Sequence, residues 1–333
     1  MDFRSDNVTG ASPEILAALA EASRGSAGAY GDDDWTRRLE TRLADLFETE
    51  LAVFPVATGS AANSLALAAV SPPWGVIYCH EAAHVQVDEC GGPEFFTGGA
   101  KLMPLPGADG KLAPQALAQA VWGSGVVHHA QPAGLSITQS TECGTLYRPD
   151  EVAALAEVCR QSGLALHMDG ARFANALASL GVSPAQMTWQ AGVDVLSFGG
   201  TKNGCLAAEA LLVFKPALAE SLAFRRKRAG HLFSKMRFLS AQLLAYLEED
   251  LWLRNARHAN AMAQRLAERL QAAGGRLAHP VQANEVFAHL PAEVNRRLRE
   301  RGLLYHPWPA DGPDAYRFVT AFDTPEAALA AVT

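Results

Sequence analysis

The most informative part of this 333-residue chain is the stretch Ser197-Phe198-Gly199-Gly200-Thr201-Lys202-Asn203, which belongs with His167-Met168-Asp169-Gly170-Ala171-Arg172 upstream. In the later stretch a lysine follows the apolar segment 193–198 and stands among glycines. In the earlier one an aspartate follows the apolar segment 164–168. Both segments have the length and composition of buried strands, so the sequence places Asp169 and Lys202 just beyond strand ends.

The residues around these stretches alternate short apolar segments with longer amphipathic ones. The segments predicted as strands are 52–56, 75–79, 125–127, 135–138, 164–168 and 193–198. The segments predicted as helices are 61–70, 149–162 and 173–180. Pro149 stands at a favoured first helical position, and Gly163 stands where a helix ends. This alternation predicts βαβ units: an α/β fold with a mostly parallel central sheet, helices on both faces, and ligands at the carboxyl ends of the strands.

The chain changes character from about residue 234. The stretches 234–250 and 252–273, rich in Ala, Leu and Arg, predict two long helices. The segments 285–290 and 316–320 predict strands, with an amphipathic helix over 293–301 between them. We therefore expect a large domain with an N-terminal arm over residues 1–245 and a smaller C-terminal α+β domain over residues 246–333.

Composition argues against several classes of protein. The chain is 49% hydrophobic and 19% charged, which is ordinary for a globular protein. The net charge of −7 and the lack of a long basic stripe argue against a nucleic-acid partner. Five cysteines without CxxC pairing argue against a disulfide framework and a zinc module, so we expect reduced thiols, a cytoplasmic protein and no metal site. The charged start and the absence of a long apolar run predict neither a secretion signal nor a membrane span.

A strand-end aspartate together with a loop lysine is what pyridoxal phosphate chemistry requires. The lysine amine forms a Schiff base with the cofactor aldehyde, and the carboxylate keeps the pyridine nitrogen protonated, so that the ring accepts electrons from a carbanion. A lysine in a glycine-rich loop is by itself most often a solvated surface residue. The order and the surroundings of Asp169 and Lys202 make the pair a strong signal.

Two further segments are candidates for the same site. Gly59 and Ser60 stand between a predicted strand and a predicted helix, where free backbone amides can hold a phosphate, although similar turns are common in proteins that bind none. His84 follows another predicted strand. Its imidazole either stacks on the pyridine ring and reaches the substrate or is a hydrogen-bonded structural group.

Several residues are candidates for binding an anion. Arg172 offers a guanidinium fork for a carboxylate. Arg317 lies within a predicted apolar strand and either extends to solvent or points at an anion. The basic cluster 225–228 is either a solvated helix face or a source of phosphate-binding cations. The polar segments around Ser5 and Tyr30 are predicted as loops.

Five segments carry a resemblance to a known family: Arg4-Ser5-Asp6-Asn7, Tyr30-Gly31-Asp32-Asp33, His84-Val85-Gln86-Val87-Asp88-Glu89-Cys90-Gly91, Asp169-Gly170-Ala171-Arg172-Phe173-Ala174-Asn175-Ala176 and Phe198-Gly199-Gly200-Thr201-Lys202-Asn203-Gly204. They resemble the low-specificity L-threonine aldolases, which are pyridoxal phosphate enzymes of the aspartate-aminotransferase-like fold type I. The resemblance runs from Arg4 to about Asp323. Residues 138–145 and 234–238 resemble the pseudomonad-type bacterial branch.

The resemblance implies a role for each matching position. Lys202 is implied to be the Schiff-base lysine, Asp169 the partner of the ring nitrogen and His84 the residue stacked on the ring. Further cofactor contacts are implied for Gly59, Ser60, Thr201 and Arg172, and substrate contacts for Ser5, Arg172, Arg317 and Tyr30. Arg237 and Arg228 match basic residues that reach the phosphate of a neighbouring subunit, which implies a catalytic dimer and a homotetramer.

One departure from the family concerns the base that takes the proton of the substrate's β-hydroxyl. Much of the family has Thr-His where this chain has Thr141-Glu142. The base is therefore His84, Glu142 or a held water. His84 is favoured, because an imidazole has an unperturbed pKa of about 6.5.

The activity implied by the resemblance is retro-aldol cleavage of L-threonine and L-allo-threonine to glycine and acetaldehyde. The alternative within enzymes is another fold type I lyase, such as a β-eliminating enzyme acting on serine or cysteine conjugates. The alternative outside enzymes is a non-catalytic scaffold that binds the cofactor, against which the intact pair of Asp169 and Lys202 speaks.

Overall fold

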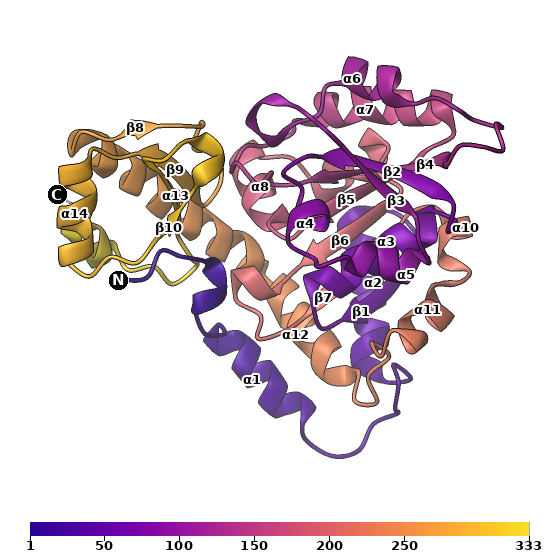
Figure 1. Cartoon of the computed structure of the whole chain (residues 1–333). Helices are drawn as coiled ribbons and strands as arrows, with labels where there is room; N and C mark the ends of the chain where they lie inside the picture. Colours follow the sequence, from indigo (N-terminus) through magenta and orange to yellow (C-terminus); the bar gives the residue numbers. More distant parts are fainter. Residues whose placement is uncertain (333) are drawn as a thin grey trace.

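The computed structural model describes residues 1–332, and Thr333, the last residue of the predicted small domain, lies outside the described residues. Figure 1 shows a large lobe and a smaller C-terminal lobe joined by one long helix. The large lobe is built on a seven-stranded sheet. In spatial order its strands are β1 (Ala52–Val56), β7 (Glu209–Val213), β6 (Val195–Gly199), β5 (Ala165–Gly170), β4 (Gln131–Thr138), β2 (Gly75–His80) and β3 (Lys101–Leu105).

The sheet is parallel except at β7, which runs antiparallel to both of its neighbours, β1 and β6. The strands β3, β2, β4, β5 and β6 pair in parallel, so their carboxyl ends share one edge. Asp169 pairs with Ser197 across β5 and β6. This register brings the aspartate stretch and the lysine stretch to the same edge of the sheet, as the sequence predicts.

Helices cover both faces of the sheet. The large lobe contains α1 (Pro13–Ala22), α2 (Asp34–Phe47), α3 (Gly59–Val70), α4 (His84–Val87), α5 (Gly92–Thr97), α6 (Pro114–Ala120), α7 (Pro149–Ser162), α8 (Phe173–Leu180), α9 (Pro184–Met187), α10 (Pro216–Ala219), α11 (Leu222–Arg228) and α12 (Arg237–Leu247). Ala165 of β5 packs with α3, whereas its neighbour Leu166 packs with α7 in a separate core. Successive strand residues therefore face opposite helix layers, which explains why β2 and β5 are buried throughout.

The small lobe has an antiparallel sheet that is reached through α13 (Leu251–Ala272). In spatial order its strands are β10 (His306–Pro307), β11 (Ala315–Val319), β9 (Glu285–His289) and β8 (Arg276–Leu277), with α14 (Ala292–Glu300) following β9. The α/β architecture with a mostly parallel sheet and a smaller C-terminal α+β unit is therefore confirmed.

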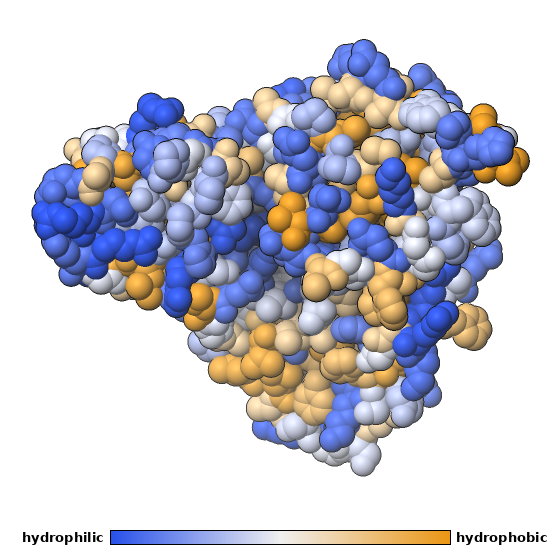
Figure 2. Space-filling model, in the orientation of Figure 1, coloured by the Kyte–Doolittle hydropathy of each residue, from blue (hydrophilic) through white to orange (hydrophobic). Residues whose placement is uncertain are grey.

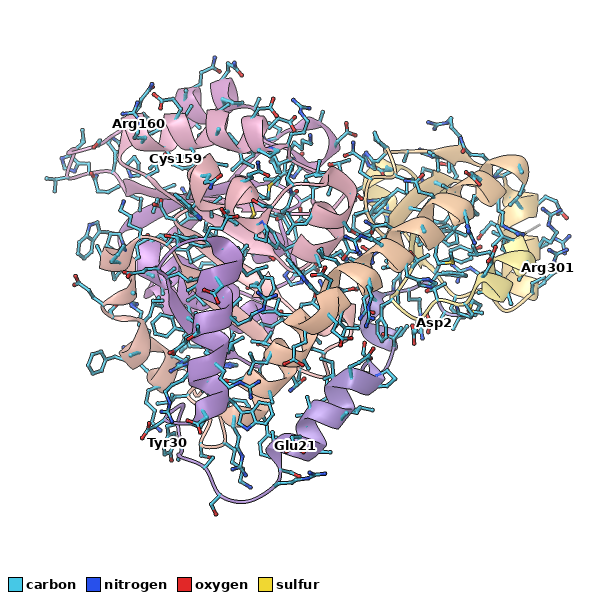
Figure 3. The ribbon with its side chains drawn as sticks, turned by 180° about the vertical axis from the view of Figure 1, so that it is seen from behind. Asp2, Glu21, Tyr30, Cys159, Arg160 and Arg301 are labelled. Atoms are coloured by element: carbon cyan, nitrogen blue, oxygen red, sulfur yellow. The ribbon has the colours of Figure 1, made fainter. Side chains whose placement is uncertain are left out.

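The N-terminal segment links the two lobes. Phe3 packs in the core of the small lobe, and Asp2 forms a β-bridge with Leu304. Figure 3 shows the segment leaving the small lobe at Asp2 and continuing into α1, with Glu21 near the lower edge of the molecule. The short helical turn η1 (Asp6–Val8) is thereby held at the junction of the lobes.

The structure differs from the sequence prediction for three strands of the large sheet: one that is absent and two that were not predicted. The predicted strand 125–127 is wrong: these residues lie in turns, Val127 is 96% exposed, and Gly125 has a φ of +76° that a strand does not allow. The Gln131 side chain fixes this loop by bonding the Gly125 amide and three carbonyl oxygens of the same loop. The strands β3 and β7 were not predicted.

The surface is hollowed and mostly hydrophilic where the two lobes meet, and an apolar area lies over α1 (Figure 2). No helix among residues 1–332 is both long enough and apolar enough to span a bilayer.

Candidate active site

Lys202 lies in the tight turn η4 (Thr201–Asn203) directly after β6. A Cβ added to Gly199 would come within 2.6 Å of the Ala171 carbonyl oxygen, so the lysine loop passes directly over the aspartate stretch and needs glycine there. On the other side, the Asn203 amide donates to the Tyr246 hydroxyl at 2.7 Å and to the Trp252 carbonyl at 2.8 Å. The backbone that carries Lys202 is thus fixed from both sides, while its side chain stays partly exposed.

Asp169 is 4% exposed at the end of β5. Its Oδ2 accepts from Nδ2 of Asn63 at 2.7 Å, and its Oδ1 accepts from the Ala171 amide at 3.0 Å. A carboxylate has about four acceptor positions, so two remain for a further donor. The protonated nitrogen of a pyridine ring is a donor of this kind.

His84 is joined to Asp169 through a buried chain of side chains. The Asn63 amide that donates to Asp169 also donates to Oε1 of Glu89 at 2.8 Å, and Nδ1 of His84 donates to the same oxygen at 2.9 Å. The hydrogen bond to Glu89 raises the pKa of His84 above its ordinary value, against burial, which lowers it. Because Nδ1 is used in this way, Nε2 is the imidazole nitrogen that is left to accept a proton.

Glu142 lies next to His84 in a loop after β4. Its Oε1 accepts from the His84 backbone amide at 2.8 Å and from the Thr138 hydroxyl at 2.7 Å. Its Oε2 is buried without a hydrogen-bond partner among the described residues. Burial raises the pKa of Glu142 to about 7, although these two hydrogen bonds oppose the shift. Glu142 is therefore both a structural acceptor and a carboxylate able to exchange a proton near neutral pH.

The start of α3 offers an anion site on the same helix that carries Asn63. Thr58 caps the helix by accepting from the Ala61 amide at 3.2 Å. No atom lies within 4 Å of the position where Gly59 lacks a Cβ, and Ser60 is exposed. Free amides at a helix start in open space suit a phosphate. Together with Lys202, Asp169 and His84, this donor set fits pyridoxal phosphate.

Arg172 is not a free cation. Its Nε and Nη2 donate to Asp6 at 2.8 and 3.2 Å, and its Nη1 lies 3.2 Å from Oε2 of Glu285. Burial raises the pKa of Asp6, but the charges of Arg172 and Lys202 outweigh it and bring the pKa below its ordinary value. For Glu285 the effect of burial is larger than that of the charges of Arg172 and Arg317, so the pKa is raised above its ordinary value. A substrate carboxylate that binds Arg172 must therefore share it with these two carboxylates.

Arg317 is held more loosely at the same junction. Its Nη2 donates to the Arg4 carbonyl at 3.3 Å, its guanidinium lies 5.1 Å from the centre of the Trp308 ring, and its Nε has no hydrogen-bond partner among residues 1–332. Ser5 caps the turn that carries Asp6, since its hydroxyl accepts from the Asn7 amide at 3.1 Å. Ser5, Arg172 and Arg317 are thus brought to one region, as the sequence predicts.

Three predicted site residues are not joined to this cluster by any hydrogen bond between described residues. Tyr30 is 51% exposed, its ring lies 5.1 Å from the Lys227 amine, and its amide donates to Ser234. Figure 3 shows it at the lower edge of the large lobe, away from Asp2. The Arg237 guanidinium lies over Phe238, and Arg228 is exposed at the end of α11. Tyr30 and Arg228 are exposed, whereas Arg237 is partly buried and its Nε has no hydrogen-bond partner among the described residues.

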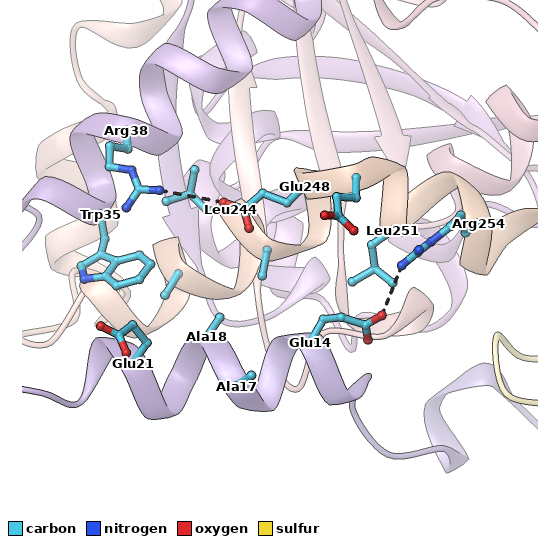
Figure 4. Close-up of a pocket in the computed structure, with 13 residues that line it drawn as sticks. Glu14, Ala17, Ala18, Glu21, Trp35, Arg38, Leu244, Glu248, Leu251 and Arg254 are labelled. Atoms are coloured by element: carbon cyan, nitrogen blue, oxygen red, sulfur yellow. Dashed lines mark hydrogen bonds and ion pairs between the residues drawn. The ribbon is translucent and has the colours of Figure 1, made fainter.

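A groove of about 650 Å³ lies elsewhere, between α1, α2 and α12. Figure 4 shows Trp35 and two ion pairs along it, Arg38 with Glu248 and Glu14 with Arg254. None of the predicted site residues lines this groove. This groove is therefore separate from the candidate active site.

Sequence reasoning missed the residues that connect the site. Asp6 and Glu89 stand within the segments that carry the family resemblance but received no role, and Asn63 was seen only as a residue of the predicted helix 61–70. Glu285 was seen only as a strand residue. The signal that finds them is a charged or amide side chain inside an otherwise apolar or small-residue segment, because such a group is buried only with a partner.

Comparison with known proteins gives a consistent result. The model of the family described as beta-eliminating lyase matches residues 2–293. The low specificity L-threonine aldolase of Pseudomonas aeruginosa is 48% identical over 97% of this chain and 93% of that protein. The enzyme of the same name from a Pseudomonas species is 46% identical over 98% of this chain and 94% of that protein.

The solved structures agree in fold. The threonine aldolase of Leishmania major superposes with a TM-score of 0.93 at 27% identity, over 99% of this chain and 97% of that one. Aspartate aminotransferase from Thermus thermophilus superposes with a TM-score of 0.72 at 16% identity, over 97% and 87% of the two chains, which supports the fold alone. The chain therefore belongs to the low-specificity L-threonine aldolases, within the beta-eliminating lyase family and with the architecture of fold type I.

Proposed function

We propose that this protein uses pyridoxal phosphate, held by Lys202, to cleave L-threonine, L-allo-threonine and related β-hydroxy-α-amino acids to glycine and an aldehyde. The observation that carries the proposal is the buried Asp169, which Asn63 and Glu89 connect to His84 at the sheet edge beside Lys202. Pyridoxal phosphate, when bound, supplies an electron sink for the pair left at Cα when the Cα–Cβ bond breaks.

The residues of the large lobe hold the cofactor in this proposal. The Asp169 carboxylate accepts from the ring nitrogen with the positions that Asn63 and Ala171 leave open. The amides at Gly59 and Ser60 receive the phosphate, and Thr201 contributes beside Lys202. His84 stacks on the ring.

The His84 imidazole is the proposed base. Its Nε2 accepts the β-hydroxyl proton while Nδ1 keeps its bond to Glu89, and the Glu89 carboxylate stabilises the imidazolium that forms. The same proton, or one from water, is returned to Cα to give glycine, so no proton is consumed overall. The rival base is Oε2 of Glu142, which has no other partner among the described residues.

The substrate carboxylate is proposed to bind between Arg317, Arg172 and Ser5. Arg317 has an Nε donor without a hydrogen-bond partner among the described residues, whereas Arg172 is held in place by Asp6 and Glu285. A carboxylate held at this place would fix the orientation of the bonds at Cα and so would help to select the Cα–Cβ bond for cleavage.

We further propose a cytoplasmic homotetramer, a dimer of dimers with sites shared between subunits. Tyr30 and Arg228 are exposed, and the partly buried Arg237 has no hydrogen-bond partner for its Nε among the described residues, as expected of residues that complete the site of a neighbouring subunit. The five cysteines are all free, which suits a reducing compartment. Light scattering of the purified protein, compared with Arg237→Glu, tests the assembly.

The function is tested by product analysis of the purified protein loaded with pyridoxal phosphate. We expect acetaldehyde and glycine from L-threonine and L-allo-threonine, and little pyruvate or ammonia from L-serine. Pyruvate and ammonia as the main products would favour the β-eliminating lyase, the alternative that the description of the matching family keeps open. A bound chromophore without turnover of any of these amino acids would favour a non-catalytic scaffold.

A further inference from the structure

A histidine of the small lobe with no assigned role bridges the two lobes. His279 lies in the loop after β8, and its Nδ1 is 2.8 Å from Oδ1 of Asp109 in the large lobe, within the turn η2 (Ala108–Gly110). Its Nε2 is 3.0 Å from Oδ2 of Asp311 in the small lobe. An ionised carboxylate only accepts hydrogen bonds, so His279 donates to Asp109. This bond joins one lobe to the other.

The turn that holds Asp109 is attached to a second turn, residues 141–145, which carries Glu142 and is called the Glu142 turn below. The Glu142 turn begins and ends with buried threonines whose hydroxyls both donate to the Asp109 carbonyl oxygen, at 3.2 and 2.6 Å. A Cβ added to Gly110 would lie 2.9 Å from the Thr141 side chain, so the two turns are in direct contact. A displacement of Asp109 therefore displaces the Glu142 turn.

The small lobe also contacts the Glu142 turn directly. The Leu146 amide, just after the turn, donates to Oε1 of Gln282 at 2.8 Å. A Cβ added to Gly144 would lie 3.1 Å from Cβ of Glu285 and 3.2 Å from its carbonyl oxygen. The Glu142 turn is thus held between Asp109 and the segment of the small lobe that begins β9, and the bond from His279 to Asp109 ties these two supports together.

The position of the Glu142 turn matters for the hydroxyl of the substrate. Oε1 of Glu142 accepts from the His84 backbone amide at 2.8 Å, so both candidates for the base are attached to this turn. The substrate carboxylate, by contrast, is proposed to bind Arg317 of the small lobe. L-threonine and L-allo-threonine differ only in the direction of the hydroxyl at Cβ. A shift of the hydroxyl acceptor relative to the bound carboxylate therefore cannot affect the two substrates equally.

We propose that His279 is a positioning residue that sets the discrimination between L-threonine and L-allo-threonine, because its bond to Asp109 fixes the small lobe relative to the Glu142 turn. This inference rests on the proposed function and deepens it, since it assigns substrate selectivity to a contact between the lobes.

The first experiment removes the bridge from the large-lobe side. Asp109 has a φ of +56°, which glycine adopts without strain, so Asp109→Gly deletes the carboxylate and keeps the carbonyl that serves the Glu142 turn. The values of kcat/KM for both substrates are measured with the holoenzyme, because their ratio does not depend on the fraction of folded protein. We expect this ratio to change by about threefold, as suits the modest strength of a half-exposed ion pair. An unchanged ratio would overturn the proposal.

The second experiment removes the same bridge from the small-lobe side. His279→Ala should change the ratio in the same direction as Asp109→Gly, and the double variant should change it no further than His279→Ala alone, because both substitutions delete one bond. Additive effects in the double variant would mean that the two residues act independently, which contradicts the proposal.

The matched control is His289→Ala. His289 is another histidine of the small lobe, and its Nδ1 lies 2.9 Å from Oδ1 of Asp314, which belongs to the same lobe. This pair does not join the lobes, so its loss should leave the ratio unchanged. A change as large as that in His279→Ala would mean that any perturbation of the small lobe alters the ratio, and the bridge would then have no special role.

Hydrogen exchange tests the route from His279 to the site. The peptide that contains residues 141–145 should exchange faster in Asp109→Gly and His279→Ala than in the wild type and in His289→Ala. A changed ratio with unchanged exchange of this peptide would contradict transmission through the Glu142 turn.

The wild-type holoenzyme distinguishes the two levels of failure. If it cleaves neither L-threonine nor L-allo-threonine, the proposed function is wrong and the role of His279 is overturned with it. If it cleaves both and the ratio is the same in Asp109→Gly and His279→Ala, only the role of His279 is overturned.

Discussion

The two sides of the candidate site are built differently. On the cofactor side, Asp169, Asn63, Glu89 and His84 come from the large lobe alone and form one continuous chain of hydrogen bonds. On the carboxylate side, Asp6, Arg172, Glu285 and Arg317 come from the N-terminal arm, the large lobe and the small lobe. The hydrogen-bond chain of the first side is formed within one lobe, whereas the second side holds its main cation in ion pairs that join the arm and both lobes.

This difference indicates that the two sides of the site serve different functions. A network within one rigid sheet can set ring orientation and proton position without further rearrangement. A cluster that spans both lobes can respond to a substrate carboxylate, because the new anion competes with Glu285 for the same guanidinium. Substitutions on the two sides should therefore differ in kind as well as in size.

The largest effect is expected at Lys202. Lys202→Ala should abolish turnover and remove the visible absorption band of the lysine-linked cofactor, because no other amine stands at the sheet edge beside Asp169 among the described residues. Lys215→Ala, which changes an exposed lysine at the start of α10, should leave both unchanged. Absorption spectra of the purified variants give the answer, and persistence of the band in Lys202→Ala would place the linkage elsewhere.

The next effect concerns the base. His84→Asn should lower kcat by roughly 10²-fold, the lower end of effects measured for general bases. Glu142→Gln should cost much less, since the amide still accepts from Thr138 and from the His84 backbone. Steady-state kinetics with L-threonine decide the ranking, provided that both variants retain the cofactor band. The reverse ranking would make Glu142 the base and leave His84 as a stacking partner.

Substitution of the two arginines on the carboxylate side should affect substrate binding and the stability of the fold to different extents. Arg317→Ala should cost on the order of 2–4 kcal/mol in kcat/KM with little change in the free energy of unfolding. Arg172→Ala should lower kcat/KM as well and also destabilise the fold by about 3–5 kcal/mol, because it leaves Asp6 and Glu285 buried without their cation.

Urea unfolding of both variants, with the surface variant Arg254→Ala as the control, measures the stability difference between them. Wild-type stability in Arg172→Ala would show that the ion pairs do not support the fold. Wild-type kcat/KM in Arg317→Ala would show that this arginine does not touch the substrate.

The smallest and most specific effect is expected at Glu89. Because Glu89 raises the pKa of His84, and a base must be neutral to accept a proton, activity falls as the pH drops through that raised pKa. Glu89→Gln removes the charge, lowers the pKa of His84 and should move the acid limb of the kcat/KM profile down by about one pH unit. A limb that stays in place, or that moves to higher pH, would exclude His84 as the titrating group.

Much of the fold can be predicted from local patterns. The helices α7 and α8 have the predicted bounds because each has an apolar face and ends at a glycine, and α7 also begins at a proline. The false strand at 125–127 shows the limit of this reasoning, since three residues of suitable composition do not overcome a glycine with positive φ and a loop fixed by Gln131. The strand β7 was not predicted because its first residue, Glu209, is charged and shortens the apolar run to the four residues after it.

The sequence by itself determined the α/β class, the sheet edge at which Asp169 and Lys202 meet, and the family of the chain. These depend on residue order, hydrophobic period and the chemistry of a few side chains, all of which are local. Only the tertiary structure decided which partner each polar group takes: Asn63 between Asp169 and Glu89, Arg172 between Asp6 and Glu285, and Glu209 beneath the Lys202 loop. These partners lie up to 166 positions apart in the chain, and a buried polar group takes whichever donor or acceptor the packing of distant segments brings within about 3 Å.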